Sequence, residues 1–228
     1  MIWNITRIYD KDTSLLIKVP PDIIRQVTEG HDRLSRTYHD PNPVVRLLNW
    51  GKLKGLIRMV QGTSFSVILD YACGNGILLP TLANIGKTVI GFDLYPEPAK
   101  KIVTLYALRS TFVMKADAMR IPLENASVDL VIAANVLEHF KELTIPLKEI
   151  LRILKPQGIL LVSVPSENRL YEIGRSILGY KKPIDHYQTG DQVLRALDNQ
   201  MRVEEVRYFP PFLIKNLAVY HLIKARKG

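Results

Sequence analysis

Three aspartates stand where apolar segments of the chain end, and two glycines follow the first of them. The segments and their acids are 65–69 with Asp70, 88–92 with Asp93, and 111–114 with Asp117. An ionised aspartate only accepts hydrogen bonds, and one carboxylate has room for two donors such as paired hydroxyls. Aspartate is also a common helix N-cap, which is the structural alternative at each position taken alone. Three acids in step favour one shared ligand.

The turn after Asp70 contains Gly74 and Gly76, and glycine lets a backbone turn tightly or approach a ligand closely. A tight strand-to-helix connection without a ligand is the plain alternative. The dinucleotide fingerprint places Gly or Ala three residues after its second glycine, where this chain has Leu79. The Asp70 carboxylate would also repel phosphates and suit a cation. The turn therefore favours a nucleoside that carries positive charge over a nicotinamide dinucleotide.

Strand and helix patterns alternate around these residues. The pattern predicts strands at 65–69, 88–92, 111–114, 128–134, 159–164, 203–209 and 218–225, and helices at 77–85, 96–108, 135–140, 143–154 and 191–199. This order predicts an α/β fold with a doubly wound, mostly parallel seven-stranded sheet. The short link at Pro210-Pro211 predicts an antiparallel hairpin between the last two strands. The turn residues 155–158 should precede the fifth strand.

Two further segments complete the predicted organisation. Residues 1–60 should form a mainly helical N-terminal extension, and residues 61–228 the ligand-binding domain. The insertion 165–190 follows a central strand, so it should overhang the ligand edge on the substrate side. Residues 44–60 form an apolar helix with interspersed basic residues, which could rest on anionic lipid or simply cover the sheet.

Composition bounds the class of protein. The 228 residues are 47% hydrophobic and 23% charged, with a formal net charge of +9. That charge favours RNA, a membrane surface or a phosphorylated substrate as partner, unless it is scattered for solubility. One cysteine allows no internal disulfide, and no Cys/His spacing predicts a metal site. The opening residues 1–5 lack a signal-peptide layout, so we expect a cytoplasmic protein.

Several of these segments together resemble the class I S-adenosylmethionine-dependent methyltransferases. The resemblance covers about residues 65–165 and is nearest to the branch that includes ubiquinone and menaquinone methyltransferases. The matching segments are Leu69-Asp70-Tyr71-Ala72-Cys73-Gly74-Asn75-Gly76, Gly91-Phe92-Asp93-Leu94, Ala116-Asp117-Ala118, Leu137-Glu138-His139-Phe140 and Lys155-Pro156-Gln157-Gly158. The family implies a Rossmann-like methyltransferase fold and S-adenosyl-L-methionine as cofactor.

The resemblance also implies which positions meet the cofactor. They are Asp70, Ala72, Cys73, Gly74, Gly76, Asp93, Leu94, Asp117, Ala118, Asn135 and Val136. By this resemblance Asp70 lies near the amino group, Asp93 accepts the ribose hydroxyls, and Asp117 binds the adenine amino group. The backbone around Asn135 and Val136 would face the methionyl end.

Catalytic residues are less defined by the sequence. His139 and His186 are weak candidates for a general base, and histidines in such positions are more often structural. Tyr38 and His39 could cover the cofactor from the N-terminal segment. The chain has Ala134-Asn135-Val136-Leu137 where amino-methylating enzymes of adenine or glutamine carry Asn/Asp-Pro-Pro-aromatic, and its one cysteine lies in the cofactor loop.

The expected acceptor is therefore a small molecule or a lipid-linked molecule. Basic residues would suit a phosphorylated or membrane-borne acceptor, namely Arg46, Lys52, Lys54, Arg58, Arg175, Lys181 and Lys182. Methylation of RNA is an alternative suggested by charge alone. A non-catalytic binding module on the same fold is the other alternative, and the aligned acids speak against it.

Overall fold

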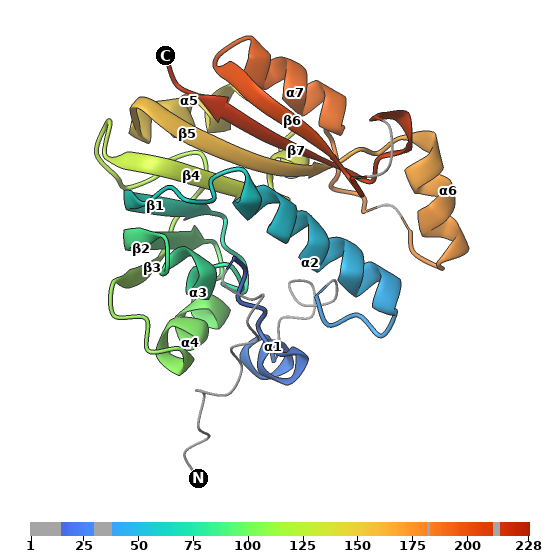
Figure 1. Cartoon of the computed structure of the whole chain (residues 1–228), viewed down its shortest axis with the longest axis horizontal. Coiled ribbons are helices and arrows are strands. Elements are labelled where there is room, and N and C mark those ends of the chain that lie inside the picture. The colour runs from blue at the N-terminus through green and yellow to red at the C-terminus, as the bar shows by residue number, and fades with distance from the viewer. Residues whose placement is uncertain (1–14, 30–37, 182, 212–214) are drawn as a thin grey trace.

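The computed structural model describes residues 15–29, 38–181, 183–211 and 215–228, and its centre is one seven-stranded sheet (Figure 1). The strand order is β3-β2-β1-β4-β5-β7-β6. The strands are β1 (Phe65–Tyr71), β2 (Gly86–Asp93), β3 (Thr111–Lys115), β4 (Val128–Ala134), β5 (Leu154–Pro165), β6 (Arg202–Phe209) and β7 (Tyr220–Arg226). The first five strands pair in parallel, while β7 pairs antiparallel with β5 and β6. The predicted sheet, with its antiparallel C-terminal strands, is confirmed.

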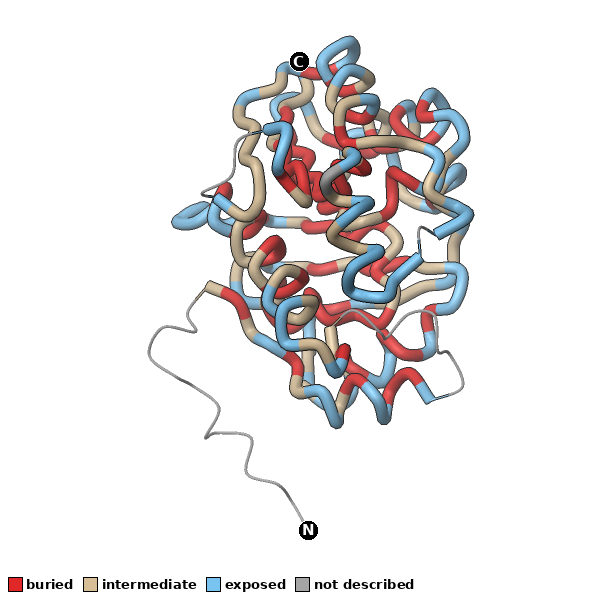
Figure 2. The backbone as a smooth tube through the Cα atoms, turned by 90° about the vertical axis from the view of Figure 1, so that its right-hand side faces the viewer, coloured by how far each residue is buried: buried red, intermediate tan, exposed pale blue. Residues whose placement is uncertain are grey.

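Helices cover both faces of this sheet. The described helices are α1 (Pro21–Val27), α2 (Pro43–Arg58), α3 (Leu79–Leu82), α4 (Glu97–Leu105), α5 (Thr144–Ile153), α6 (Arg169–Ile177) and α7 (Gly190–Asp198), with 3₁₀ turns η2 (Leu137–His139) and η3 (Lys215–Leu217). Successive residues of β1 belong to opposite cores, Ile68 to the one under α1 to α4 and Leu69 to the one under α5 and α7. The buried strands run through the middle of the molecule in Figure 2. The sheet is therefore doubly wound.

Four predicted elements differ from the structure. The helix predicted at 135–140 is only the 3₁₀ turn η2 (Leu137–His139). The helix predicted at 77–85 is only the short α3, because Gly76 has φ +75° and residues 83–85 form a hydrogen-bonded turn that leads into β2. Residues 155–158, predicted as a turn, belong to β5, and the strand pairing shifts between Val128 and Leu130. The link between β6 and β7 is not short, since it spans residues 210–219 and contains η3.

The N-terminal helices pack on the sheet rather than standing apart from it. Asn42 caps α2 by accepting a 2.9 Å hydrogen bond from the Val44 N–H. A Cβ atom on Gly51 would lie 2.4 Å from the Phe209 ring, so glycine permits the close approach of α2 to the hairpin. Trp50, Lys52 and the leucines of the same face are buried. The apolar face of α2 is therefore packed inside the protein, and the prediction that this face rests on anionic lipid is wrong.

Some sequence predictions remain untested by the fold. The domain boundary at residue 60 stays a prediction, although Leu53 and Leu56 of α2 share a core with Ile68 of β1. Residues 1–5, examined for a signal peptide, and Lys182 lie outside the described residues. Within the described ranges, no helix is both long enough and apolar enough to cross a bilayer.

Candidate active site

The three aspartates lie at the carboxyl edge of three adjacent strands. Asp70 pairs in register with Gly91, two residues before Asp93 on β2. Asp93 pairs with Lys115, two residues before Asp117. In the order β1, β2, β3, each acid therefore lies two residues further along the strand direction than the acid of the preceding strand. Ligands of open parallel sheets bind at this edge.

Asp93 is oriented by two backbone donors. The Gly74 N–H donates a 2.9 Å hydrogen bond to Asp93 Oδ2, and the Tyr95 N–H donates one of 2.9 Å to Oδ1. The Cys73 N–H donates to the Phe92 carbonyl at 2.8 Å, which fastens the glycine turn to β2. Each Asp93 oxygen keeps a second lone pair. The half-buried carboxylate can thus accept two further donors from a ligand.

Asp70 is a buried acid beside that carboxylate. Its side chain is only 3% exposed. Burial and, as the smaller cause, the charge of Asp93 together raise the pKa of Asp70 from 3.8 to about 7. A cation placed against Asp70 would favour its ionised form and relieve the repulsion between the two acids. The site is therefore suited to a ligand that carries positive charge.

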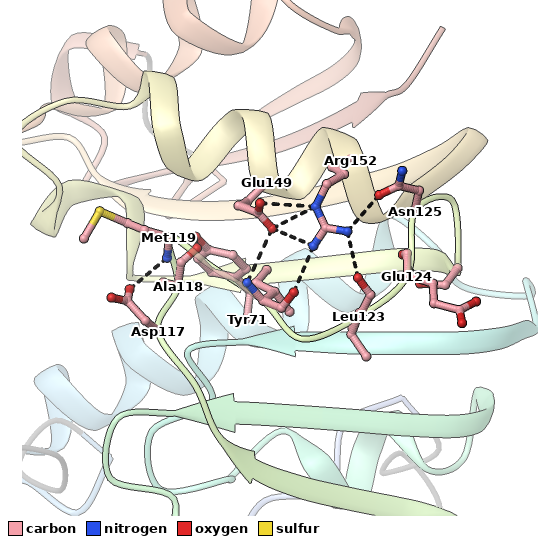
Figure 3. Close-up of polar contacts among 11 residues, drawn as sticks. Tyr71, Asp117, Ala118, Met119, Leu123, Glu124, Asn125, Glu149 and Arg152 are labelled. Carbon is pink, nitrogen blue, oxygen red and sulfur yellow. Dashed lines mark hydrogen bonds and ion pairs between the residues drawn. The ribbon is translucent and has the colours of Figure 1, made fainter.

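The loop that carries Asp117 is clamped by helix α5 (Figure 3). Arg152 donates to the carbonyl oxygens of Leu123 at 2.7 Å and Ile121 at 2.9 Å, and it pairs with Glu149 at 2.7 Å. At the other end of the loop, the buried Tyr71 hydroxyl donates to the Ala118 carbonyl at 2.7 Å. Both ends of the loop are therefore held.

This loop and the residues after β2 present a fixed carboxylate and exposed apolar surface that suit a flat ring. Asp117 Oδ1 accepts the Met119 N–H at 2.8 Å, so the carboxylate is fixed at the loop surface. Leu94, Tyr95 and Met119 are exposed large apolar side chains at the ends of β2 and β3. Exposed apolar groups beside an orienting carboxylate suit the two faces and the edge of a base.

Two predicted contact residues can act only through their backbones. The Cys73 side chain is buried in the core, and its sulfur faces Gly91 of β2. A Cβ on Gly76 would lie 2.8 Å from Ala99 of α4, so this glycine permits close packing of α4. Packing against α4 thus explains the glycine at position 76 without a ligand, and close approach of a ligand to Gly76 stays a prediction. Gly74 and Ala72 have φ of 54° and 55° and form the turn itself.

Asn135 and Val136 follow β4 on the same edge. The Asn135 N–H donates to the Ser163 carbonyl at 2.8 Å, and the Ser163 hydroxyl donates to Asn135 Oδ1 at 2.9 Å. Val136 is buried. Because Asp70 pairs with Ile132, two residues before the end of β4, this loop starts level with the glycine turn. The loops after β1 and β4 therefore face one shared space.

The two candidate histidines come together beside this space. The rings of His139 and His186 are 4.9 Å apart, and His186 Nδ1 lies 2.8 Å from Glu167 Oε1. Burial lowers the pKa of His139, and the neighbouring His186 lowers it further. Burial alone would raise the pKa of Glu167, but hydrogen bonds from His186 and Arg175 outweigh it and hold that pKa at about 2. Each histidine has a carboxylate partner, since His139 Nδ1 lies 3.3 Å from Asp185.

The sequence analysis did not predict that two ionisable groups, Glu138 and Lys52, are buried here. Burial raises the pKa of Glu138 and lowers the pKa of Lys52, while their mutual attraction opposes both effects. Lys52 Nζ donates to Asn49 at 2.8 Å and lies 4.2 Å from the centroid of the Tyr220 ring. Burial raises the pKa of Tyr38, and the charges of Asp70 and then Glu138 raise it as well. The role of Tyr38 as a cover of the cofactor stays a prediction.

Known proteins resemble this chain along its central part and in its fold. A family model described as a methyltransferase domain matches residues 69–162. A malonyl-[acyl-carrier protein] O-methyltransferase of Marinomonas sp. is 27% identical over 189 residues, which are 78% of this chain and 68% of that protein. A ubiquinone biosynthesis O-methyltransferase of Actinobacillus pleuropneumoniae is 28% identical over 142 residues, covering 58% of this chain and 61% of that protein. The chain thus spans about two thirds of these curated relatives.

A solved structure shares the fold. The N-methyltransferase NodS of Bradyrhizobium japonicum, solved with S-adenosyl-L-homocysteine, superposes with a TM-score of 0.65 at 17% identity, over 87% of this chain and 98% of that one. The family match, the strand order and the acidic edge agree with one another. Residues 69–162 therefore match the methyltransferase domain family, and the fold around them is that of S-adenosylmethionine-dependent methyltransferases.

Proposed function

We propose that this protein transfers a methyl group from S-adenosylmethionine to a small-molecule or lipid-linked acceptor. The proposal rests on one observation above all, the stepped row of Asp70, Asp93 and Asp117 along one sheet edge beside the Gly74 turn. When bound, S-adenosylmethionine supplies an electrophilic methyl group on a sulfonium. The relative NodS, whose structure contains the demethylated cofactor, supports the same type of ligand here.

The residues present fit this cofactor. Asp93 keeps two free lone pairs where a ribose would place its hydroxyls, and Leu94 beside it is exposed to meet a base. Asp117 and the Ala118 N–H would bind the edge of the adenine. Asp70 would lie against the charged amino group. Asn135 and Val136 would present their backbone to the methionyl end, with the glycine turn opposite.

The chemical step asks little of the protein beyond alignment of the acceptor. Holding two reactants in line can supply on the order of 7–11 kcal/mol of the barrier. His139 and His186, whose rings are 4.9 Å apart, would lie on the methyl side of the site and would orient an acceptor or remove its proton. An oxygen acceptor is supported by the O-methyltransferases among the relatives, and a nitrogen acceptor by NodS. RNA as acceptor rests on net charge alone.

A lipid-linked acceptor has support from helix α6. Ile173, Ile177 and Leu178 are exposed large apolar residues of this helix and its end, and Ile184 follows at 95% exposure. Such a face with nearby Lys181 would rest on an anionic membrane surface from the cytoplasmic side. Lys52 and Arg175, which the sequence analysis grouped with Lys181, are not part of this exposed face. The Lys52 side chain is buried, and Arg175 is 9% exposed and paired with Glu167.

Calorimetry with S-adenosylhomocysteine, followed by transfer assays with labelled S-adenosylmethionine, tests the proposal. We expect binding of S-adenosylhomocysteine but not of NAD, and label transfer to a catechol, hydroxy-acid, amine or quinol panel rather than to RNA. Sedimentation with anionic liposomes, comparing wild type with Ile177→Glu, tests the membrane surface. Absence of cofactor binding would overturn the proposed function. Transfer to RNA alone would overturn the acceptor class.

A further inference from the structure

Lys52 is a buried cation whose contacts within the protein are incomplete. The residue is 1% exposed, and its ammonium donates to Asn49 Oδ1 at 2.8 Å and lies 4.2 Å from the centroid of the Tyr220 ring. Among the described residues, no carboxylate lies within ion-pair distance of Lys52 Nζ. Buried charges are normally paired, and an ammonium has three N–H donors. The described contacts therefore leave room for an anion.

We propose that Lys52 binds the carboxylate of the methyl acceptor, so that the acceptors of this protein are organic acids. This inference rests on the proposed function, because it names the class of small molecule that receives the methyl group. A carboxylate would supply the counter-charge that the buried ammonium lacks, through a charge-assisted hydrogen bond. A single lysine suits the single charge of a carboxylate better than the nearly double charge of a phosphate monoester.

The surroundings of Lys52 lie at the ligand edge of the sheet. Helix α2, which carries this lysine, packs on β5 and β7 (Figure 1). Tyr220, the first residue of β7, pairs with Pro165, the last residue of β5, and β5 runs parallel to β4 and β1. The Tyr220 ring next to the ammonium therefore belongs to the same carboxyl edge as Asp70. An acceptor held by Lys52 would be on the side of the sheet where the cofactor is proposed to bind.

A second aromatic ring near the ammonium, that of Tyr38, also borders a cavity. The centroid of the Tyr38 ring is 5.7 Å from Lys52 Nζ. The cavity has a volume of about 340 Å³, and its lining includes Tyr38, Trp50 and two basic residues, Lys18 and Arg46. An organic acid would place its apolar part in this cavity and direct its carboxylate past Tyr38 toward Lys52. The two basic residues of the lining would attract the anion to the cavity.

Glu138 is a second buried group that lacks a partner and interacts with the charge of Lys52. Glu138 is fully buried, and among the described residues neither carboxyl oxygen has a hydrogen-bond partner. Buried polar atoms are hydrogen-bonded in the great majority of cases, so this carboxyl indicates a partner from outside the chain. Burial raises the pKa of Glu138 to about 7, so its protonated form can donate to an acceptor oxygen instead of repelling it.

The competing explanation is that Lys52 is structural and that Asn49 and the tyrosine rings are its only partners. Burial lowers the pKa of Lys52 from 10.5 to about 7, although the attraction of Glu138 opposes this effect, so the ammonium is poorly stabilised by its present contacts. A bound carboxylate would favour the charged form. A structural lysine predicts no preference of the protein for acids over uncharged molecules of the same shape, whereas a carboxylate site predicts a preference that depends on Lys52.

Titration of the full chain with benzoate and hexanoate, each compared with its uncharged amide, tests the inference. Ligand-observed NMR measures each Kd, with and without S-adenosylhomocysteine. We expect at least one acid to bind about tenfold or more tightly than its amide, because the amide keeps the shape and loses the charge. Lys52→Met should weaken acid binding by about tenfold or more and leave amide binding as in wild type. Lys148→Met, which removes an exposed lysine of α5, is the matched control and should bind both as wild type does.

Asn49→Asp tests the same site with the lysine in place, and it decides the question if Lys52→Met fails to fold. The new carboxylate would occupy the 2.8 Å contact and act as an internal counter-ion, so acid affinity should fall. Equal affinity of wild type for acid and amide, or wild-type acid affinity in either folded variant, would overturn the inference.

The outcomes also separate this inference from the proposed function. S-adenosylhomocysteine binding is measured by calorimetry on the same proteins. Cofactor binding without a preference for acids would remove the acid site alone. A Lys52-dependent preference for acids without cofactor binding would remove the methyl-transfer function alone.

Discussion

The backbone N–H of Gly74 donates a 2.9 Å hydrogen bond to the carboxylate of Asp93, which joins the turn after β1 to the end of β2. The other Asp93 oxygen accepts the Tyr95 N–H. One side chain thus positions the glycine turn and offers its remaining lone pairs to a ligand. This double use makes Asp93 the most informative single position in the site.

Replacing Asp93 with Asn should weaken cofactor binding. The amide keeps the size of the side chain but turns one acceptor into a donor, which then faces a backbone N–H or a ribose hydroxyl. Loss of a hydrogen bond to a charged group costs about 1.5–3 kcal/mol, so the Kd for S-adenosylhomocysteine should rise about 10- to 150-fold. Isothermal titration calorimetry measures this change.

Asp129→Asn is the matched control for that measurement. Asp129 accepts the Val67 N–H at 2.7 Å and pairs with Lys155 at 2.8 Å, near the amino ends of β1 and β4 and away from the cofactor edge. It should lower the free energy of unfolding while leaving the affinity for S-adenosylhomocysteine as in wild type. An Asp93→Asn affinity within twofold of wild type would refute the ribose assignment.

Arg152→Met should loosen the loop that holds Asp117. The guanidinium satisfies the carbonyls of Leu123 and Ile121 and the Glu149 carboxylate together. Without it these groups lose their donors, and the free energy of unfolding should fall by about 2–4 kcal/mol in urea titrations. Arg152→Lys should recover little, because an ammonium cannot reproduce the planar fork of donors.

Cofactor affinity separates this clamp from general destabilisation. Arg226→Met removes a comparable arginine that binds Glu204 and the Gln157 carbonyl on the far part of the sheet. Both variants should lose stability. We expect only Arg152→Met to raise the Kd for S-adenosylhomocysteine, several-fold, since only that loop carries Asp117 and Ala118. Equal affinities in the two variants would show that the clamp does not position the adenine.

Much of the fold was predictable because strand patterns and their terminal acids coincide. Each apolar segment from 65–69 to 128–134 became a strand with nearly the predicted bounds, since buried parallel strands read as continuous apolar runs. The helix after Gly76 was overpredicted. Apolar residues there reflect burial from all sides, and periodicity does not separate a buried loop from a buried helix.

The ionisable cluster beside the site was not predictable in the same way. Lys52 belongs to a helix whose basic residues look solvent-facing in sequence. Because α2 packs closely on Phe209 at Gly51, the neighbouring Lys52 side chain is buried. Glu138 meets His186 only because the 185–188 segment folds back on η2 through backbone hydrogen bonds. Such contacts depend on tertiary packing of distant segments, which local patterns do not encode.

The buried acid Asp70 should make stability fall as pH rises. Its pKa is raised from 3.8 to about 7 on folding, so the folded state holds the proton more tightly than the unfolded state. That stabilisation is complete below pH 3.8 and is lost as the pH rises through 7. Relative to Asp70→Asn, the wild-type free energy of unfolding should drop by about 2 kcal/mol between pH 5 and pH 7.5. Urea titrations of both proteins at each pH measure it, and a pH-independent difference would contradict the assignment.

Cofactor binding should release a proton from the same carboxyl. Near pH 6.5 Asp70 is largely protonated in the free protein, because its pKa is about 7. The positive amino group of the methionyl moiety, placed against it, favours the ionised form and expels the proton. Calorimetric enthalpies of S-adenosylhomocysteine binding in buffers of different ionisation enthalpy should then give a slope of about half a proton or more at pH 6.5.

Two comparisons assign that proton to Asp70. In Asp70→Asn the slope at pH 6.5 should fall close to zero, and in wild type it should shrink at pH 8, where the acid is already ionised before the ligand arrives. Affinity should fall in the variant as well, because the ligand loses its counter-charge. An equal slope in both proteins would place the titrating group elsewhere, and the candidate would then be Glu138, whose pKa burial also raises. Glu138→Gln in the same buffers distinguishes these two acids.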